Sequence, residues 1–499
     1  MDTASSALSL AKLILPKMPM IGKTILSHSL GISPNSNHWD LKTELTVNVL
    51  RSLTHATPHS ISQTQASTLH DPGIKGKTWI AKVTLAAPAE DDARQQLFRA
   101  IEDMKEEGSP RGGGFDEPAL RPVEAEWTGH RAGATKDSKR LCMPESQHYT
   151  EMMKEVSAPT TILYMHGGAH WLLDPASYRV PLTKLARLTG GRVLSLRYRL
   201  APQHPFPAAL LDCLVAYLNL LFPPPDALHA PVPPEHIILS GDSAGGNLAL
   251  SLLLLLLHWH RSSTCIIWNG TAHRIPLPAG LALNSPWTDL LRSSPSNAQP
   301  TNLQNDYIPP PTFSPVYPPC PLWPTSPPRP NIYSETPLLL HPLVSPLAAP
   351  TPSWAQTPPI LFQTGTELLT DESKILAARI VRAGASVRWE QYDMMPHCFA
   401  LVLPHLEASK RCFEGWAGFC REVVGLGVGG EEERERERER EQEQGKEKSP
   451  AKTLNVLRTS GKKFSVKSLQ ETQVDVAGLW DESDQDVLER MRESLRVLE

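Results

Sequence analysis

Apolar residues in the middle of the chain alternate between short runs and longer stretches with helical spacing. The short runs are typical of buried strands, and the longer stretches are typical of helices that pack on a sheet. The predicted strands cover residues 79–85, 124–128, 161–165, 192–198, 236–240, 279–284, 360–365 and 386–392. The predicted helices comprise one ending at residue 188, then 208–220, 244–258, 371–383 and roughly 404–424. Repeated strand–helix units of this length predict an α/β fold with a mostly parallel, doubly wound central sheet.

Three stretches fall outside this rhythm. Between the first two predicted strands we expect only a polar, glycine-rich loop. Residues 286–359 hold 21 of the 48 prolines in the chain, so we expect an insertion without regular structure, which is usually a lid, a binding loop or a disordered segment. Residues 431–448 carry nine Glu against four Arg and two Lys and have no apolar face, which is typical of a solvated helix or a disordered linker.

These breaks predict four regions. An N-terminal cap or helical region covers residues 1–70, and a catalytic domain with the proline-rich insertion covers 71–425. A charged linker, 426–450, then leads to a helical extension, 451–499. In this extension the apolar residues have helical spacing and predict one stripe that docks on the main body, formed by Val487, Leu488, Met491, Leu495 and Leu498.

The composition excludes several classes of protein. With a net charge of -4 over 499 residues, the chain is neither a basic nucleic-acid binder nor an acidic solvating chain. The seven cysteines are scattered and have no metal-ligand spacing, so we expect neither a metal site nor a disulfide framework. The first residues lack a basic leader, and the most apolar run, 248–259, is too short to cross a bilayer, so we expect a cytoplasmic protein. Residues 7–15 are the one candidate for a weak peripheral contact with a membrane surface.

The strongest chemical signal is a G-x-S-x-G sequence, Gly241–Gly245, between a predicted strand and an apolar helix. A serine on such a sharp turn needs small neighbours, and its hydroxyl then projects above the sheet. The start of the following helix also favours the negative charge that develops on an attacked carbonyl. Ser243 is therefore the candidate nucleophile.

A second signal, His166-Gly167-Gly168-Ala169, directly follows the strand at 161–165. Consecutive small residues in such a turn leave backbone N–H groups free to point at one spot, as an oxyanion hole requires. The candidate hole comprises Gly167, Gly168, Ala169 and Ala244. Of these, Gly168 and Ala169 are the expected donors with Ala244 as the third, and alanine suffices at 169 provided that its φ is negative.

The candidate base is His397, in a loop after the last predicted strand. A serine hydrolase of this layout has the chain order Ser, acid, His, which makes both Glu367 and Asp371 candidate acids. Glu367 is preferred because it comes directly off the strand end, whereas Asp371 has a structural explanation in the first turn of a helix. Asp242 and Asp289 are expected to be structural, and Trp171 and Trp287 are candidate pocket walls.

Together these motifs resemble the hormone-sensitive-lipase-like branch of the α/β-hydrolases. The resemblance covers about residues 155–425 and rests on HGGA, on YRLAP with HPFPA (198–208), on GDSAGGN and on MPH, in that order. It implies a sheet of about eight strands, a cap built partly from N-terminal residues, and cofactor-free hydrolysis of carboxylic esters. In that family the acid commonly lies about 30 residues before the His, which again points to Glu367. HGGA replaces the usual HGGG, and Glu stands where Asp is frequent.

The sequence thus predicts a serine esterase that acts on a small-molecule ester through an acyl-enzyme. Two alternatives remain open. One is a non-catalytic receptor that keeps the hydrolase pocket, and the other is an amide or lactone hydrolase.

Overall fold

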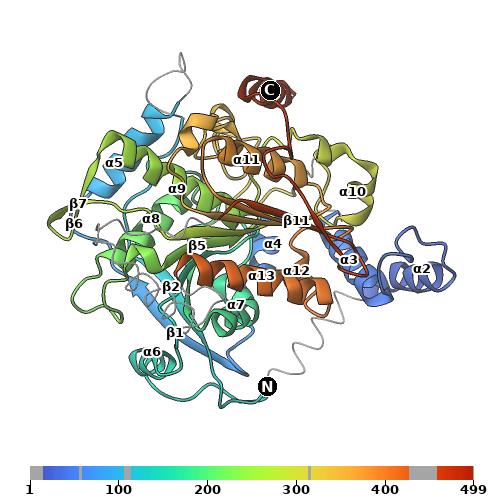
Figure 1. Ribbon diagram of the computed structural model, residues 1–499, viewed down its shortest axis with the longest axis horizontal. Helices are drawn as coiled ribbons and strands as arrows, with labels where there is room; N and C mark the ends of the chain where they lie inside the picture. Colours follow the sequence, from blue (N-terminus) through green and yellow to red (C-terminus); the bar gives the residue numbers. More distant parts are fainter. Residues whose placement is uncertain (1–14, 56–58, 106–113, 313–315, 426–457, 498–499) are drawn as a thin grey trace, which may run out of the picture.

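The computed structural model describes residues 15–55, 59–105, 114–312, 316–425 and 458–497 (Figure 1). Its centre is a ten-stranded sheet with the order β1-β2-β4-β3-β5-β8-β9-β10-β11-β12. The strands are β1 Thr78–Leu85, β2 Val123–His130, β3 Thr161–Met165, β4 Arg192–Arg197, β5 Ile237–Asp242, β8 Gly280–Asn284, β9 Ile360–Gly365, β10 Val387–Tyr392, β11 Ser460–Phe464 and β12 Glu471–Gln473. All neighbours from β4 to β11 are parallel, and the pairs β1–β2, β2–β4 and β11–β12 are antiparallel. The predicted α/β class and mostly parallel sheet are confirmed.

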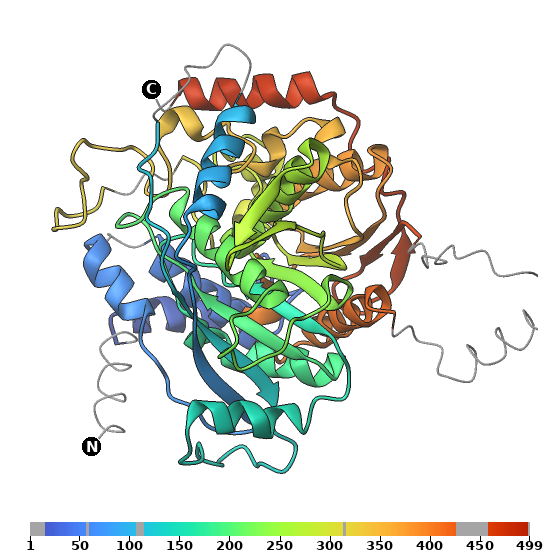
Figure 2. The same ribbon diagram turned by 90° about the vertical axis from the view of Figure 1, so that its left-hand side faces the viewer.

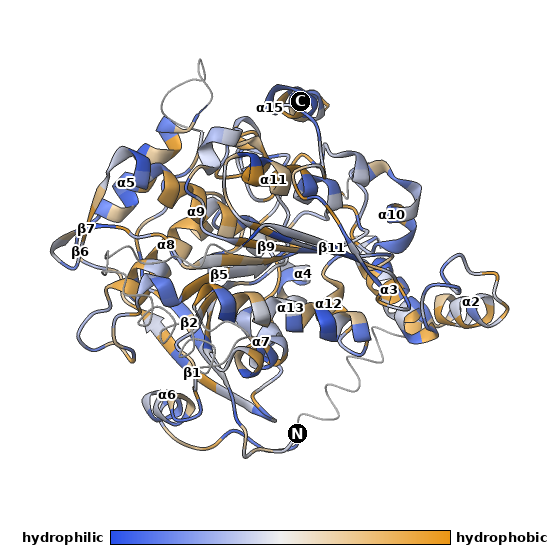
Figure 3. Cartoon of the chain, in the orientation of Figure 1, coloured by the Kyte–Doolittle hydropathy of each residue, from blue (hydrophilic) through white to orange (hydrophobic). Residues whose placement is uncertain are grey.

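Helices cover both faces of the sheet (Figure 1). The helices α7 Pro175–Thr189 and α13 Glu407–Val423 pack on one face, and α8 Ala208–Leu221, α9 Ala244–Ser262 and α11 Thr370–Arg382 pack on the other. The leucine-rich run of α9 is completely buried in this second layer, and it stands out in the hydropathy colouring of Figure 3. Within the described ranges, no helix has the length and apolar character that a membrane span needs.

The stretch between β1 and β2 differs from its prediction. It contains the helix α5 Asp92–Asp103 instead of only a loop. Leu97, Phe98 and Ile101 share one face at helical spacing and are buried in the same core as α8 and α9. The many charged residues of this segment belong to the other face of the helix, which is why the sequence resembled a loop. Two further elements are the helix α6 Glu145–Met153, which packs against β1, and the small hairpin of β6 Cys265–Trp268 with β7 Thr271–Arg274, which packs against α5.

The segment after the charged linker adds two strands as well as a helix. In Figure 2, β11 and β12 form the right-hand edge of the sheet, and β11 pairs in parallel with β10. The helix α15 Asp484–Arg496 then buries Val487 and Met491 from the predicted stripe. Leu498 and the whole of the predicted linker, 426–450, lie outside the described residues. The two strands escaped prediction because their sequences, SGKKF and ETQ, carry almost no apolar residues, as is common at a sheet edge.

The proline-rich insertion is a packed part of the body. The expectation of no regular structure is wrong in part: no strand occurs among its described residues, but it contains the short helices η3 Pro295–Ala298, α10 Pro300–Asn305, η4 Thr336–Leu338, η5 Pro346–Ala348 and η6 Thr351–Trp354. Its side chains Leu339, Leu343, Leu347 and Trp354 are fully buried in the main core. The insertion is therefore anchored over much of its length rather than hinged as a free lid.

The N-terminal helices pack against loops that follow β3, β4 and β10. They are η1 Leu15–Lys17, α2 Met18–Ser29, α3 Leu41–Thr54 and α4 Ile61–Thr68. Gln65 of α4 donates from Nε2 to the carbonyls of Trp171 (2.8 Å) and Ala201 (2.7 Å). Trp39, just before α3, donates from its indole to the carbonyl of Met394 at 2.8 Å.

Candidate active site

Ser243 occupies the sharp turn between β5 and α9. Its backbone has φ 51° and ψ -120°, in a region that costs a non-glycine residue roughly 1–3 kcal/mol. The turn is held by the backbone at the end of β8 and just after it, since the Ser243 N–H donates to the Asn284 carbonyl (3.1 Å) and the Ser243 carbonyl accepts from the Trp287 N–H (3.0 Å). A Cβ on Gly245 would lie 1.9 Å from the carbonyl oxygen of Met165, which explains the glycine after the serine.

Asp242 joins this turn to the glycine turn after β3. Its Oδ1 accepts from the Tyr164 hydroxyl (2.7 Å) and from the Gly167 N–H (3.0 Å), while its Oδ2 accepts from the Tyr178 hydroxyl (2.9 Å). Burial raises the pKa of this carboxyl, and the three donors oppose that shift. The geometry agrees with the structural role expected for Asp242.

The glycine turn differs from its prediction in two respects. The N–H of Gly167 is already bound to Asp242 and to Tyr178 (3.1 Å), so Gly167 is not available as an oxyanion donor. Ala169 has φ 53°, although a negative φ was expected. Within the described part of the chain the N–H groups of Gly168 and Ala169 donate no hydrogen bond, and Ala244 is the first residue of α9.

Two histidines are buried in the same turn. The carbonyl of His166 accepts from the Tyr198 hydroxyl at 2.6 Å, and burial lowers the pKa of His166 to about 4. The ring of His170 stacks on Tyr333 with 3.7 Å between centroids, and burial lowers the pKa of His170 to about 3. Both side chains are therefore neutral near pH 7.

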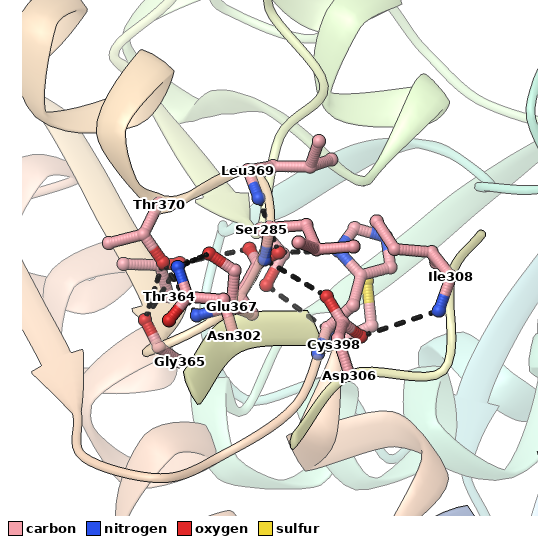
Figure 4. Close-up of polar contacts among 12 residues, drawn as sticks. Ser285, Asn302, Asp306, Ile308, Thr364, Gly365, Glu367, Leu369, Thr370 and Cys398 are labelled. Atoms are coloured by element: carbon pink, nitrogen blue, oxygen red, sulfur yellow. Dashed lines mark hydrogen bonds and ion pairs between the residues drawn. The ribbon is translucent and has the colours of Figure 1, made fainter. Parts of the chain in front are cut away.

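His397 lies beside Glu367 on the other side of the site. Its Nδ1 is 3.4 Å from Oε2 of Glu367, an ion-pair contact between two buried side chains. Glu367 also accepts from the N–H of Leu369 (2.7 Å) and from the hydroxyl of Thr364 (3.1 Å), as Figure 4 shows. Burial lowers the pKa of His397, but the carboxylates of Glu367, Asp306 and Asp242 outweigh it, so the pKa lies above its ordinary value.

Asp371, the other candidate acid, has a different partner. It lies in the first turn of α11, and its carboxylate pairs with Lys374 at 2.9 Å. The structure brings Glu367, rather than Asp371, to His397.

Asp306, in the insertion, escaped the sequence analysis. Its Oδ1 accepts from the His397 N–H (3.1 Å) and its Oδ2 accepts from the Leu368 N–H (3.0 Å). Figure 4 shows its carboxylate in the same cluster as Glu367 and the backbone of the histidine loop. No motif marks this aspartate, because its partners lie 62 and 91 residues further along the chain.

The two predicted pocket residues have different surroundings. Trp287 lies next to the nucleophile turn, since its backbone N–H donates to the Ser243 carbonyl. Its indole N–H donates to the backbone carbonyl of Asp289 (2.8 Å). Trp171 is buried against Tyr317, with 5.8 Å between ring centroids. A cavity of about 810 Å³ borders the glycine turn at His166, but its lining includes neither tryptophan. In the described residues, no group of three or more His, Cys, Asp or Glu is placed to hold a metal ion.

Comparison with known proteins places this architecture among the hydrolases. The family model of the alpha/beta hydrolase fold matches residues 162–401. An acetyl-hydrolase of Streptomyces hygroscopicus is 32% identical over 271 residues, which are 54% of this chain and 77% of the relative. An esterase of Acinetobacter venetianus is 35% identical over 146 residues, 29% of this chain and 41% of that protein. Among solved structures, an esterase of the bacterial hormone-sensitive lipase family aligns with 67% of this chain and 99% of its own, at 25% identity and a TM-score of 0.42.

Proposed function

The chain belongs to the alpha/beta hydrolase fold family, and on that premise we propose that it cleaves carboxylic esters through an acyl-enzyme formed on Ser243. Related proteins carry the names esterase and acetyl-hydrolase, which supports an esterase-like hydrolase. The observation that carries the proposal is the contact of His397 with the buried Glu367, at the same end of the sheet as the strained serine turn.

In the first half of the reaction, His397 takes the proton of the Ser243 hydroxyl as the serine oxygen attacks the ester carbonyl. Glu367 holds the imidazole in the tautomer that accepts at Nε2 and stabilises the imidazolium that forms. The raised pKa of His397 agrees with this second task.

The negative charge of the tetrahedral intermediate falls on the carbonyl oxygen. The N–H groups of Gly168, Ala169 and Ala244 are the proposed donors to it, each contributing roughly 3 kcal/mol. What supports this role is that the N–H groups of Gly168 and Ala169 donate to no other group of the described residues, while the positive φ of Ala169 is a departure from the expected geometry.

The alcohol then leaves with the proton held by His397. In the second half a water molecule gives its proton to His397 and attacks the acyl group, which leaves as the acid and restores the Ser243 hydroxyl. No step requires a metal or an organic cofactor.

The direct test replaces the nucleophile. Ser243→Ala should reduce hydrolysis of p-nitrophenyl butyrate by roughly 10³-fold or more while the protein stays folded, as judged by its thermal unfolding. Activity that survives this change at the wild-type rate would refute the assignment of Ser243.

A further inference from the structure

The N-terminal helix α2 has an inverted pattern of burial. Its one buried residue is polar: Thr24 accepts from the side chain of Asn48 at 3.1 Å, and Nδ1 of the nearby His28 lies 2.5 Å from a carboxylate oxygen of Glu44. Lys17, just before the helix, donates to the carbonyl of Ser52 at 3.1 Å. Polar contacts therefore fasten α2 to α3.

The outward side of this segment is apolar instead. Six large apolar side chains of residues 15–32 are between 42% and 72% exposed, namely Leu15, Met18, Ile25, Leu26, Leu30 and Ile32. They are six of the fourteen large apolar side chains that are exposed in the described residues, which concentrates them in a short segment. Figure 1 shows α2 at the right-hand margin of the molecule, beside α3 and away from the sheet. Such a concentration on a monomer surface marks an interaction site.

The charges of the segment indicate the partner. From residue 3 to residue 39 the sequence contains three Lys and no Asp or Glu. A second copy of the same face would bring these lysines against one another in a symmetric dimer, which is unfavourable. An anionic lipid surface instead complements them, and it accepts outward Leu and Ile side chains at the boundary of headgroups and acyl chains.

We propose that residues 15–32 dock the protein on the surface of anionic lipid bilayers, with the outward side chains of α2 inserted below the headgroups. The same N-terminal unit contacts the loop that leads to His397, through the bond from Trp39 to the carbonyl of Met394, so docking would attach the lipid surface to the unit that touches this loop.

Vesicle flotation tests this proposal independently of hydrolysis. The wild type should float with phosphatidylcholine vesicles that contain phosphatidylserine and only weakly with phosphatidylcholine alone. The triple variant Leu26→Ser/Leu30→Ser/Ile32→Ser should bind at least tenfold less, and Lys23→Glu should reduce binding by roughly fivefold or more, since an acidic residue replaces a cation near the surface. The matched control is Val180→Ser, which replaces an even more exposed apolar side chain on α7 (78%) and should float as the wild type does.

Three results would overturn the proposal. They are a wild type that does not float, a triple variant that floats like Val180→Ser, and a wild-type dimer in size-exclusion chromatography that the triple variant converts to a monomer. The triple variant should hydrolyse a water-soluble ester as fast as the wild type, so a failure here is distinct from a failure of the proposed esterase activity.

Asp306 carries a second, independent inference, which rests on the proposed function. Its carboxylate is buried and bridges the two loops that supply the acid and the base, through the N–H groups of Leu368 and His397. Its own carbonyl accepts from Arg51 of α3 at 2.9 Å from Nε and 2.6 Å from Nη2. Arg51 of the N-terminal helix α3 thus fixes the backbone of Asp306, and the Asp306 carboxylate in turn fixes the loops that carry Glu367 and His397.

We infer that Asp306 is a positioning residue that sets the His397–Glu367 geometry. Asn at this position keeps one acceptor oxygen but presents an amide NH₂ to one of the two N–H groups, and Leu removes both acceptors. Catalytic efficiency should therefore fall in the order Asp, Asn, Leu.

The test measures kcat per reactive serine, counted by titration with a fluorophosphonate. Asp306→Asn should lower this kcat at least tenfold with KM within about threefold, because alignment of the base matters in the transition state. The matched control is Asp289→Asn, another fully buried aspartate of the insertion, whose partners are Ser293 and Leu291.

Equal values of kcat per reactive serine in Asp306→Asn and Asp289→Asn would overturn this role. So would a loss of activity in Asp306→Asn that is seen per total protein but not per titrated serine. An inactive wild type would instead refute the proposed function itself.

Discussion

The two halves of the candidate active site are positioned in different ways. The serine half is built from two short sequence motifs with positive φ at Ser243, Gly168 and Ala169, and the bond from the Gly167 N–H to Asp242 joins the two motifs. The acid–base half is built from two loops that are held together by a distant side chain, Asp306, which in turn is held by Arg51. The serine half therefore depends on strained backbone and on Asp242, which joins its two motifs, whereas the other half depends on an aspartate that the proline-rich insertion contributes.

The largest expected effect concerns the acid. Glu367→Gln keeps the shape of the side chain but removes the charge beside His397, so kcat/KM should fall by roughly 10²–10⁴-fold. The pKa of His397 should also decrease, because Glu367 is the strongest of the carboxylates that raise it, and the acidic limb of the pH–rate profile should move to lower pH.

Asp371→Asn is the matched control for this prediction. It removes a carboxylate four positions away that pairs with Lys374 instead of His397, so kcat/KM should change by less than about threefold. Equal losses in the two variants would remove the distinction between the two carboxylates.

A smaller effect should appear in the stability of the serine half at acidic pH. His170 is fully buried, and its folded-state pKa of about 3 lies well below that of the unfolded chain. Protons therefore bind the unfolded chain first, and this residue weakens folding as the pH falls from about 6.5 toward 3. In His170→Phe this loss is absent.

Urea unfolding at a series of pH values measures this difference. Relative to His170→Phe, the wild type should lose about 1.4 kcal/mol of unfolding free energy for each pH unit below about 6. A difference between the two proteins that stays constant from pH 6.5 to 4.5 would show that His170 is protonated in the folded state.

The smallest effect concerns Ala169. Its φ of 53° favours glycine, so Ala169→Gly should relieve backbone strain and raise the unfolding free energy by about 0.5–1 kcal/mol. Because the N–H remains, kcat should stay within about threefold of the wild type. Destabilisation measured by thermal unfolding would mean that the strain is not localised at this residue.

The comparison of the two halves also explains which features of the fold and of the site could be predicted from the sequence. The strand–helix alternation predicted the sheet, and the motifs around Ser243 and His397 predicted which loops meet, because parallel strands present their carboxyl ends at one edge. Local spacing could not reveal that the Gly167 N–H is taken by Asp242, nor that Ala169 has a positive φ. Asp306 and the strand β11 depend on partners far away in the sequence, and neither carries an apolar pattern or a motif of its own.

The central claim, that Ser243 is a nucleophile activated by His397, is tested most directly by labelling with a fluorophosphonate probe followed by peptide mass spectrometry. The account predicts one adduct per chain, on Ser243, and a labelling rate at least 100-fold lower in His397→Ala. A wild type that remains unlabelled at Ser243, or a His397→Ala variant that is labelled at the wild-type rate, would contradict it.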